Sequence, residues 1–544
     1  MLVYPSDCRP DEPMSDKKIT IYDTTLRDGA QTVGISFSLN DKLLIAGALD
    51  RLRIDYIEGG WPGSNPKDDQ FFKEIRKEKL RHAKVVAFGS TRHKSLACAK
   101  DKLIQALVVS KAEIITIVAK TWDFHVTHAL NIGLQDNLRL VYDTIAYLKD
   151  KGRAVFFDAE HFFDGYKANP DYSLQVIDKA LSAGADMIVL CDTNGGTMPE
   201  EVRRIIEEAK QGIPAPIGVH FHNDAGMAVA NSLAAVRAGA VSVQGTANGY
   251  GERCGNANLM TLVPNLVLKL GCRCGAEQSL IHLTEVSRLI SETANLAHDE
   301  RAPYVGVNSF AHKAGFHVSG LQKNTKTYEH VDPDRVGNRR KVLVSELSGK
   351  SNILFKAREL GIDLKNRVAL PAELLQKIKD LEEQGFQFEA AEGSFELLLR
   401  EAAGEYKPFF TLKGFRVISE MAGSKKLLCE ATIKVEVDGV IEHTAANGYG
   451  PVEALDNALR KALEKFYPEI REIQLSDYKV RVLNEKGGTG SAVRVLIDQK
   501  RKTEHWGTVG VSTDIIEASW QALVDGIEYM LFKKKEKTTK RKKS

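Results

Sequence analysis

Short apolar runs rich in β-branched side chains alternate with longer amphipathic stretches between residues 19 and about 250. The amphipathic stretches place apolar residues at i, i+3, i+4 and i+7, which predicts helices. The predicted helices are Asp41–Arg53, Asn137–Lys149, Ser173–Ala183, Pro199–Lys210 and Ala228–Ala238. The apolar runs predict eight strands: Ile19–Asp23, Tyr56–Gly60, Val85–Gly89, Ile114–Ala119, Ala154–Ala159, Met187–Asp192, Ile217–His222 and Val241–Thr246.

This alternation predicts an α/β fold in which helices cover both faces of a parallel sheet. Eight repeats over about 250 residues match the size of a (β/α)8 TIM barrel, which we assign to residues 18–280. An open doubly wound sheet is the alternative. It would need a glycine-rich nucleotide fingerprint after the first strand, and the sequence has none there.

The pattern changes twice beyond the predicted barrel. Residues 281–390 predict a helical linker that includes the helices Leu283–Ala297 and Pro371–Glu383. Residues 391–532 predict an α+β domain with a weak internal repeat offset by about 60 residues, consistent with two βββα units. Glycine-containing turns, Gly448–Pro451 and Gly507–Gly510, are expected before the two helices. The expected elements are the strands Phe395–Arg400, Phe409–Ser419, Leu427–Val437, Tyr478–Leu483 and Ala492–Asp498, and the helices Val452–Phe466 and Asp514–Leu531.

Composition adds limits to this picture. The 544 residues are 43% apolar and 27% charged, which suits two to four globular domains and excludes global disorder. The sequence has no apolar run near 18 residues, and residues 1–17, an N-terminal extension, lack the apolar centre of a secretory signal. We therefore expect a cytoplasmic protein that has no membrane partner. Seven scattered cysteines without a CxxC pair argue against a disulfide framework or a structural zinc site.

The net charge of +3 conceals an asymmetry between the body and the end of the chain. Residues 533–544 carry eight Lys or Arg and one Glu, which leaves −4 for the other 532 residues. No basic stripe with interleaved aromatic residues accompanies this tail, so we expect a disordered, solvated end and no nucleic-acid partner.

Polar residues cluster at the carboxyl ends of the predicted strands, which form the catalytic face of a TIM barrel. His220 and His222 lie on one side of a strand, so their two imidazoles can bind one cation. Asp28 and Asn256 can add oxygen ligands, and such a mixed set suits Mg, Mn or Zn with positions left open for substrate. Arg27 either stabilises a substrate oxygen or pairs with Asp28.

Three segments resemble the signatures of the isopropylmalate and homocitrate synthase family. The resemblance covers residues 18–530, and the C-terminal third is similar to the allosteric domain of that family. The matching segments are Leu26–Gln31 with Lys42, Ile217–Ala230, Gly251–Ala257 and, in the C-terminal third, Gly487–Arg494. Within the family, Tyr22–Gln31 and Glu58–Pro66 most resemble the branch that uses pyruvate.

The resemblance implies a role for each matching position. It implies that Arg27 supports the keto oxygen of the substrate and Thr193 holds the carboxylate of the α-keto acid. Glu160 matches the active-site glutamate, and His317 with Tyr328 matches a helper pair that covers the barrel mouth of the other subunit in a homodimer. The implied metal ligands are Asp28, His220, His222 and Asn256.

The implied reaction is a metal-dependent condensation of acetyl-CoA with pyruvate, followed by hydrolysis of the thioester. Glu160, His317, Tyr328 or a water that they hold removes the acetyl proton, and the resemblance leaves this choice open. Isopropylmalate or homocitrate synthesis is an alternative, although the sequences of Asp192–Gly196 and Asp158–Glu160 differ from those of isopropylmalate synthases. A lyase of the same superfamily and a non-catalytic ligand sensor are further alternatives.

Regulation follows from the same resemblance. An amino-acid end product is the implied effector of the C-terminal domain, with isoleucine as the first choice and leucine as the second. The turns Gly448–Gly450 and Gly487–Gly490 would let backbone N–H groups approach its carboxylate.

Overall fold

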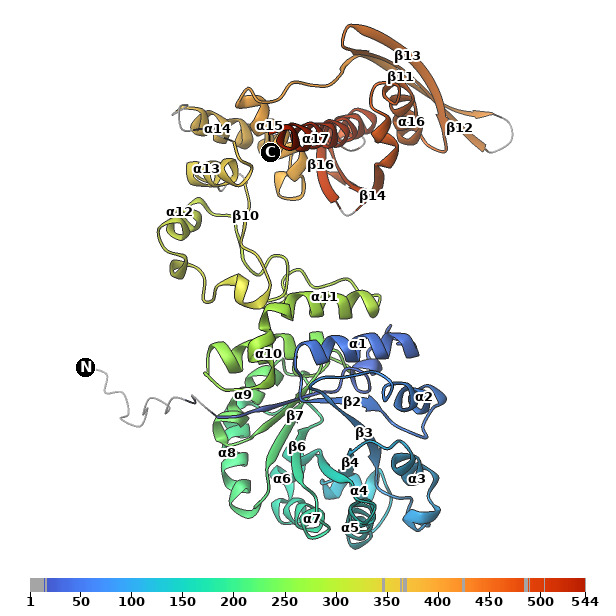
Figure 1. Cartoon of the computed structure of the whole chain (residues 1–544), viewed down its shortest axis with the longest axis vertical. Coiled ribbons are helices and arrows are strands. Elements are labelled where there is room, and N and C mark those ends of the chain that lie inside the picture. Colours follow the sequence, from blue (N-terminus) through green and yellow to red (C-terminus); the bar gives the residue numbers. More distant parts are fainter. Residues whose placement is uncertain are drawn as a thin grey trace, which may run out of the picture. The chain divides into compact units, whose positions relative to one another are not determined.

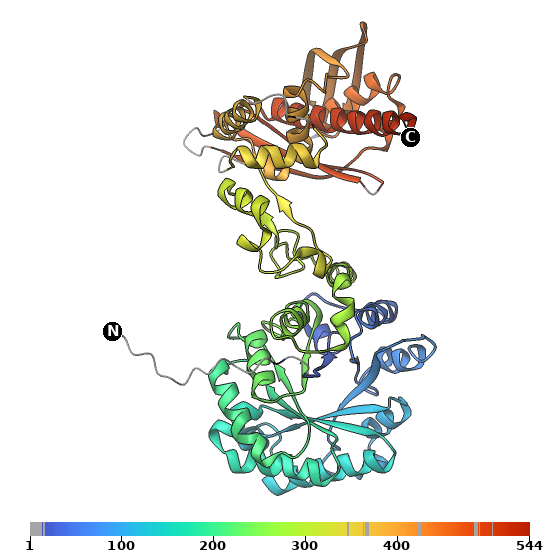
Figure 2. The same ribbon diagram turned by 60° about the vertical axis from the view of Figure 1, so that its left-hand side comes forward.

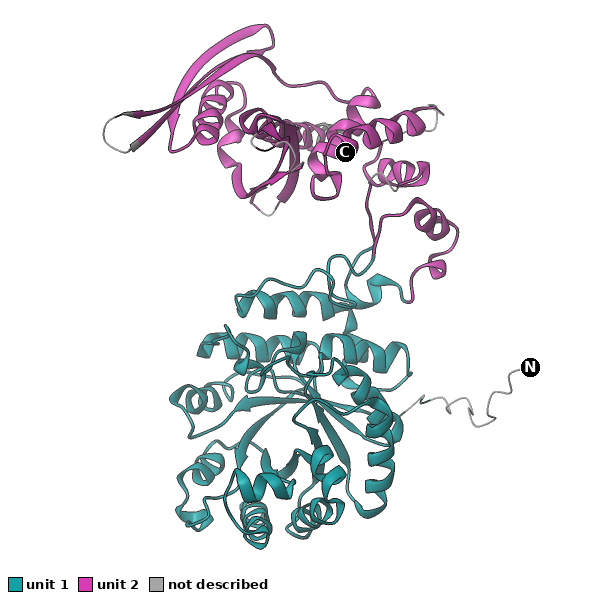
Figure 3. Cartoon of the chain, turned by 180° about the vertical axis from the view of Figure 1, so that it is seen from behind, with its two compact units in different colours: residues 1–310, 331–340 teal, residues 311–330, 341–544 magenta. Residues whose placement is uncertain are grey.

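The computed structural model describes residues 14, 17–344, 348–362, 364, 369–422, 426–483, 488, 490–502 and 504–543. Most of the predicted N-terminal extension therefore lies outside the described residues, as do positions 487 and 489 of the turn Gly487–Gly490. The chain divides into two compact units (Figure 3). The first comprises residues 1–310 and 331–340, and the second comprises residues 311–330 and 341–544.

The first unit contains a closed barrel of eight strands in sequence order (Figure 1). All neighbouring strands pair in parallel, and β1 closes the barrel against β8, with Thr20 opposite Ser242. Each predicted strand overlaps an observed one, so the TIM-barrel prediction is confirmed. The strands are β1 (Thr20–Asp23), β2 (Tyr56–Gly60), β3 (Lys84–Ser90), β4 (Ile114–Lys120), β5 (Ala154–Glu160), β6 (Met187–Asp192), β7 (Ile217–Phe221) and β8 (Ser242–Gly245).

Helices surround the barrel, so both faces of its sheet are buried (Figure 2). Local sequence fixes where several of them begin: Ser38 and Asp41 form a capping box before α1, and Pro66 starts α2. The helices are α1 (Leu39–Arg51), α2 (Pro66–Glu74), α3 (Lys102–Val109), α4 (Asp123–His128), α5 (Leu134–Asp150), α6 (Phe162–Ala168), α7 (Pro170–Ser182), α8 (Pro199–Ala209), α9 (Ala228–Ala238), α10 (Leu259–Leu268) and α11 (Leu283–Thr293).

The second unit contains two βββα repeats that follow a helical segment. Each repeat forms a three-stranded antiparallel sheet in sequence order, which confirms the predicted pair of βββα units. The helical segment has α12 (Gly315–Lys323), α13 (Lys350–Glu359), α14 (Leu370–Glu383) and α15 (Glu392–Ala402), together with the short strands β9 (Ala311–His312) and β10 (Lys341–Val342). The repeats consist of β11 (Thr411–Ala422), β12 (Lys426–Val437), β13 (Val440–Gly448) and α16 (Pro451–Leu463), then β14 (Gln474–Val482), β15 (Val493–Arg501), β16 (Glu504–Ser512) and α17 (Ile515–Lys543).

The predicted strand Phe395–Arg400 is wrong, because these residues lie in α15. A short apolar run of this kind fits a strand or a buried helix equally well from periodicity alone. α15 packs against both α17 and β16, which buries residues on more than one side of the helix and hides its 3.6-residue period.

The third strand of each repeat has no counterpart among the predicted strands. β13 is an edge strand of largely exposed and half-buried residues, so no apolar run marks it. β16 includes Gly507–Gly510, which we predicted as a turn. A Cβ at Gly507 or Gly510 would collide with the carbonyl oxygens of Ala390 and Ala518, so these glycines let neighbouring backbone approach a strand closely.

The basic tail is helical, and the prediction of a disordered end is wrong. α17 continues to Lys543, and three tail lysines have carboxylate partners. Lys533 Nζ lies 2.7 Å from Glu396 Oε2, Lys534 Nζ lies 2.8 Å from Glu469 Oε1, and Lys537 pairs with Glu504. None of the described helices combines the length and the apolar character needed to span a bilayer.

Buried carboxyl groups line a cavity of about 420 Å³ within the second unit, between α14, α15, β11 and α17. Glu528 accepts hydrogen bonds from the Tyr406 hydroxyl at 2.8 Å and from the Phe409 backbone N–H. Burial raises the pKa of Glu528 to about 7, and that of Asp525 to about 6.

We expect Glu528→Gln to change how stability depends on pH. The pKa of Glu528 rises from 4.5 to about 7 on folding, so the folded state binds more protons between these values and loses stability as the pH rises. The amide cannot ionise, and its single oxygen, in the place of Oε2, can still accept from both the Tyr406 hydroxyl and the Phe409 N–H. The gain in the free energy of unfolding of Glu528→Gln over the native protein should grow toward about 3 kcal/mol above pH 7. Thermal unfolding at several pH values tests this, with the exposed Glu517→Gln as the control, and an identical pH slope in variant and native protein would contradict it.

Candidate active site

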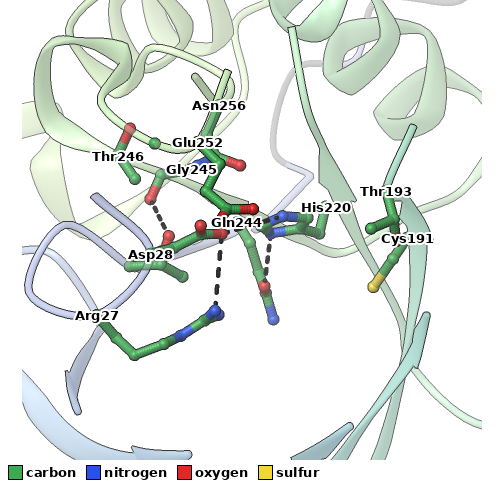
Figure 4. A network of polar contacts seen from close by, with 12 residues as sticks. Arg27, Asp28, Cys191, Thr193, His220, Gln244, Gly245, Thr246, Glu252 and Asn256 are labelled. Atoms are coloured by element: carbon green, nitrogen blue, oxygen red, sulfur yellow. Dashed lines mark hydrogen bonds and ion pairs between the residues drawn. The ribbon is translucent and has the colours of Figure 1, made fainter. Parts of the chain in front are cut away.

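The structure brings three predicted metal ligands together at the carboxyl end of the barrel. Asp28 follows β1, His220 lies on β7 and His222 follows that strand. One ligand atom from each residue lies within 4.8 Å of the other two, and all three side chains are buried. Asp28 Oδ2 is 3.5 Å from His220 Nε2, and Figure 4 shows these two side chains facing each other.

Asn256 joins this cluster through the glycine-rich loop after β8. It forms an isolated bridge with His222, and its Nδ2 donates to the Tyr250 carbonyl at 3.1 Å. Gly251 adopts φ +152°, and a Cβ there would collide with the Asn256 amide. The glycine therefore allows the loop to bring Asn256 against the cluster.

The cluster fits a divalent metal. Asn256 Oδ1 and His222 Nδ1 are buried and have no hydrogen-bond partner among the described residues. Burial lowers the pKa of His220 to about 3 and also lowers that of His222, so both imidazoles are neutral near pH 7. Burial opposes ionisation of Asp28, but the charges of Arg27 and of the two histidines, when protonated, lower its pKa overall. Neutral imidazoles and a carboxylate are the forms that bind such cations.

Arg27 lies beside the cluster and is held by a carboxylate that the sequence analysis missed. Its Nε donates to Glu58 Oε1 at 2.5 Å, its guanidinium carbon lies 3.9 Å from the Phe88 ring centroid, and Nη1 is 3.9 Å from Asp28 Oδ2. Glu58 is fully buried on β2 and also accepts from the Tyr22 hydroxyl at 2.6 Å. A charged residue in an otherwise apolar strand was the signal for Glu58.

Glu160 and Thr193 lie at the same end of the barrel. Glu160 ends β5, and its Oε2 is 2.5 Å from Lys120 Nζ at the end of β4. Thr193 follows β6, and its Oγ1 accepts from the His161 N–H at 3.0 Å. In this arrangement the hydroxyl proton of Thr193 can still be donated to a ligand.

His317 and Tyr328 belong to the second unit, where they contact each other as the resemblance implies. Their ring centroids are 4.2 Å apart and the rings are stacked at 27°. A Cβ at Gly320 would lie 2.5 Å from Tyr328 Cε2, so this glycine of α12 makes room for the ring. The part that this pair plays at a barrel mouth stays a prediction.

Three family models match successive parts of the chain. The HMGL-like model matches residues 18–290, and a curated relative from Geobacter sulfurreducens is 55% identical over 519 residues, covering 95% of this chain and 98% of the relative. That relative is an (R)-citramalate synthase. The chain belongs to the (R)-citramalate synthase family. Residues 304–385 of this family member match the homocitrate synthase post-HMGL domain-like model, and residues 389–531 match the LeuA allosteric (dimerisation) domain.

A second citramalate synthase and an isopropylmalate synthase are also similar to this chain over nearly its whole length. The (R)-citramalate synthase of Aquifex aeolicus is 50% identical over 522 residues, covering 96% of this chain and 99% of the relative. The 2-isopropylmalate synthase of Methanocaldococcus jannaschii is 32% identical over 519 residues, covering 95% of each chain. The predicted resemblance to the isopropylmalate and homocitrate synthase family is confirmed, and so is the closer likeness to its citramalate synthases.

Proposed function

We propose that this citramalate synthase family member condenses acetyl-CoA with pyruvate and hydrolyses the thioester, giving (R)-citramalate and CoA. The observation that carries the proposal is the buried cluster of Asp28, His220 and His222 at the catalytic end of the barrel, in a chain 55% identical to an (R)-citramalate synthase. Asn256 would complete the set of residues that holds a Mg, Mn or Zn ion. When bound, that ion supplies Lewis acidity to the keto group of the substrate.

Arg27 and Thr193 would orient pyruvate. Negative charge develops on the keto oxygen as the new carbon–carbon bond forms, and the Arg27 guanidinium is fixed next to Asp28 by Glu58 before this charge appears. A preorganised cation of this kind stabilises the transition state without reorganising. The Thr193 hydroxyl would donate to the pyruvate carboxylate.

A base removes a methyl proton from acetyl-CoA, and the resulting enolate carbon attacks the keto carbon of pyruvate. The keto oxygen then takes up a proton and becomes the tertiary hydroxyl group of the product. Glu160, His317, Tyr328 and a water held by them are the candidates for this base. Water then adds its oxygen to the thioester carbon, the carbon–sulfur bond breaks and CoA leaves as the thiol. We further propose a homodimer in which His317 and Tyr328 of one subunit serve the barrel of the other.

A panel of keto acids tests the proposed substrate. CoA thiol release from acetyl-CoA should give the highest kcat/KM with pyruvate, ahead of 2-oxobutyrate, 2-oxoisovalerate and 2-oxoglutarate. Each added methylene should cost roughly 10- to 200-fold if the pocket is shaped for a methyl group. A preference for 2-oxoisovalerate would instead indicate isopropylmalate synthesis, and thiol release with none of the four would refute the condensation.

We expect isoleucine to inhibit by binding to the C-terminal domain. Gly450 precedes α16 and has extended backbone angles that valine also adopts, and apart from its two chain neighbours no described atom lies within 4 Å of the position that a Cβ would take there. Gly450→Val should block the approach of the effector carboxylate to the Gly448–Gly450 turn. Saturating isoleucine should slow the native enzyme about 5- to 150-fold, and the variant much less. Equal inhibition of the two proteins would place the effector elsewhere.

A further inference from the structure

Gln244 and Asp158 form a buried polar chain that leads to His220 and that the proposed reaction leaves unexplained. Gln244 on β8 is 1% exposed, and Asp158 on β5 is 4% exposed. Gln244 Nε2 donates to Asp158 Oδ1 at 3.2 Å, and Gln244 Oε1 lies 3.1 Å from His220 Nδ1 (Figure 4 labels Gln244 and His220).

The strand register explains how Asp158, Gln244 and His220 come into contact. His220 and Gln244 are direct partners in the parallel pair β7–β8, so their side chains lie side by side within the barrel. β5 is not a neighbour of β8 in the sheet, and the contact between Asp158 and Gln244 therefore crosses the barrel interior. Polar contacts across a core filled by side chains such as Phe156 and Val189 are costly unless they are fully paired.

The direction of these hydrogen bonds fixes the state of the imidazole. The carboxamide has one donor end and one acceptor end. Asp158 takes the donor end, so the oxygen of Gln244 faces His220 Nδ1, and Nδ1 must carry the proton. The lone pair then resides on Nε2, which is the atom facing Asp28. Burial and the nearby Glu58 raise the pKa of Asp158, but Oδ1 can accept in either protonation state because a neutral acid can carry its proton on Oδ2.

We propose that Gln244 and Asp158 are positioning residues that hold His220 in its metal-binding orientation and tautomer. Outer partners of metal-bound histidines act in this way and are typically worth 10- to 100-fold in metal affinity. The inference rests on the proposed metal site. It adds that the carboxamide oxygen of Gln244 is the required group and that Asp158 acts only through Gln244.

Two substitutions at Gln244 separate positioning from packing. Gln244→Glu keeps an acceptor for His220 Nδ1–H but can place a charge in the core, whereas Gln244→Met keeps the volume and loses the acceptor. The proposal predicts that Mn²⁺ binds to metal-stripped Gln244→Met about 10- to 100-fold more weakly than to native protein, and to Gln244→Glu with near-native affinity. If Gln244 only filled space, Gln244→Met would bind Mn²⁺ with near-native affinity and Gln244→Glu would bind it more weakly.

A double-mutant cycle tests the part played by Asp158. Asp158→Leu should weaken Mn²⁺ binding less than Gln244→Met does, and adding it to Gln244→Met should cause no further loss, because its partner is already absent. Fully additive losses of Mn²⁺ affinity would contradict the inference that Asp158 acts through Gln244. Gln278→Met is the matched control, since that exposed glutamine only accepts from Arg53 at 2.8 Å.

The same titrations distinguish failure of the inference from failure of the proposed site. Free Mn²⁺ is measured by electron paramagnetic resonance, and thermal unfolding confirms that each variant is folded. Native protein that fails to bind Mn²⁺, or that binds it unchanged after Asp28→Asn, would refute the metal site itself. Native binding that depends on Asp28 but is identical in Gln244→Met would overturn only the positioning role.

Discussion

Replacing His222 with alanine is expected to abolish tight binding of a divalent metal and nearly all turnover. The substitution removes one of two buried imidazoles from a site whose ligand atoms lie within 4.8 Å of one another, and no other described His, Cys, Asp or Glu joins that cluster to replace it. Asp28→Asn should behave similarly, because it keeps the shape of the side chain but removes the negative charge that attracts the cation.

Metal analysis and thermal unfolding together check this result. Added Mn²⁺ should raise the melting temperature of the native protein but not that of His222→Ala, since a ligand stabilises only the state that binds it. His282→Ala is the control, because that histidine is about half exposed and pairs only with Glu285 on α11. Full activity of a metal-free His222→Ala protein would sink the assignment.

The sequence predicted the barrel because its strands are buried on both faces. A strand such as Met187–Asp192 is then apolar from Met187 to Cys191, and its end is marked by the change to a polar residue, Asp192. The same change from apolar to polar residues identified the candidate metal ligands, because a histidine or aspartate at the end of an apolar strand is easily recognised. Strands in the second unit gave a weaker signal, because β13 buries so little that its sequence resembles a loop.

Contacts between distant strands were the part that sequence alone could not supply. Glu58 interrupts an otherwise apolar strand, whereas Gln244 lies in the mixed strand Ser242–Gly245 and does not stand out. Nothing in their spacing pairs Glu58 with Arg27, or Gln244 with both Asp158 and His220. These pairings depend on which strands face each other across a closed barrel. The spacing of residues likewise gave no sign of the helper pair, His317 and Tyr328, which was predicted only from the family resemblance.

His317→Ala and Tyr328→Phe are expected to lower kcat by about 10²- to 10⁴-fold, the range for a lost acid or base group. Tyr328→Phe is the sharper variant, because it can keep the ring stacked on His317 at 4.2 Å and removes only the hydroxyl. Pyruvate binding should change little, since Arg27, Thr193 and the metal would hold that substrate. Lys323→Ala, at the end of the same helix and exposed, is the control.

Mixing two inactive variants tests whether the helper pair acts on the other subunit. In a dimer of one Asp28→Asn chain and one His317→Ala chain, a helper that acts across the dimer leaves one complete site, built from the intact barrel of one chain and the intact helper pair of the other. Random exchange of subunits should then restore about a quarter of native activity, because half of the dimers are mixed and each has one working site. A helper that serves its own barrel would restore none.

The single variants His317→Ala and Tyr328→Phe also test whether the pair is catalytic at all. A rise in the KM for pyruvate alone, with kcat unchanged in both variants, would remove His317 and Tyr328 from the catalytic set.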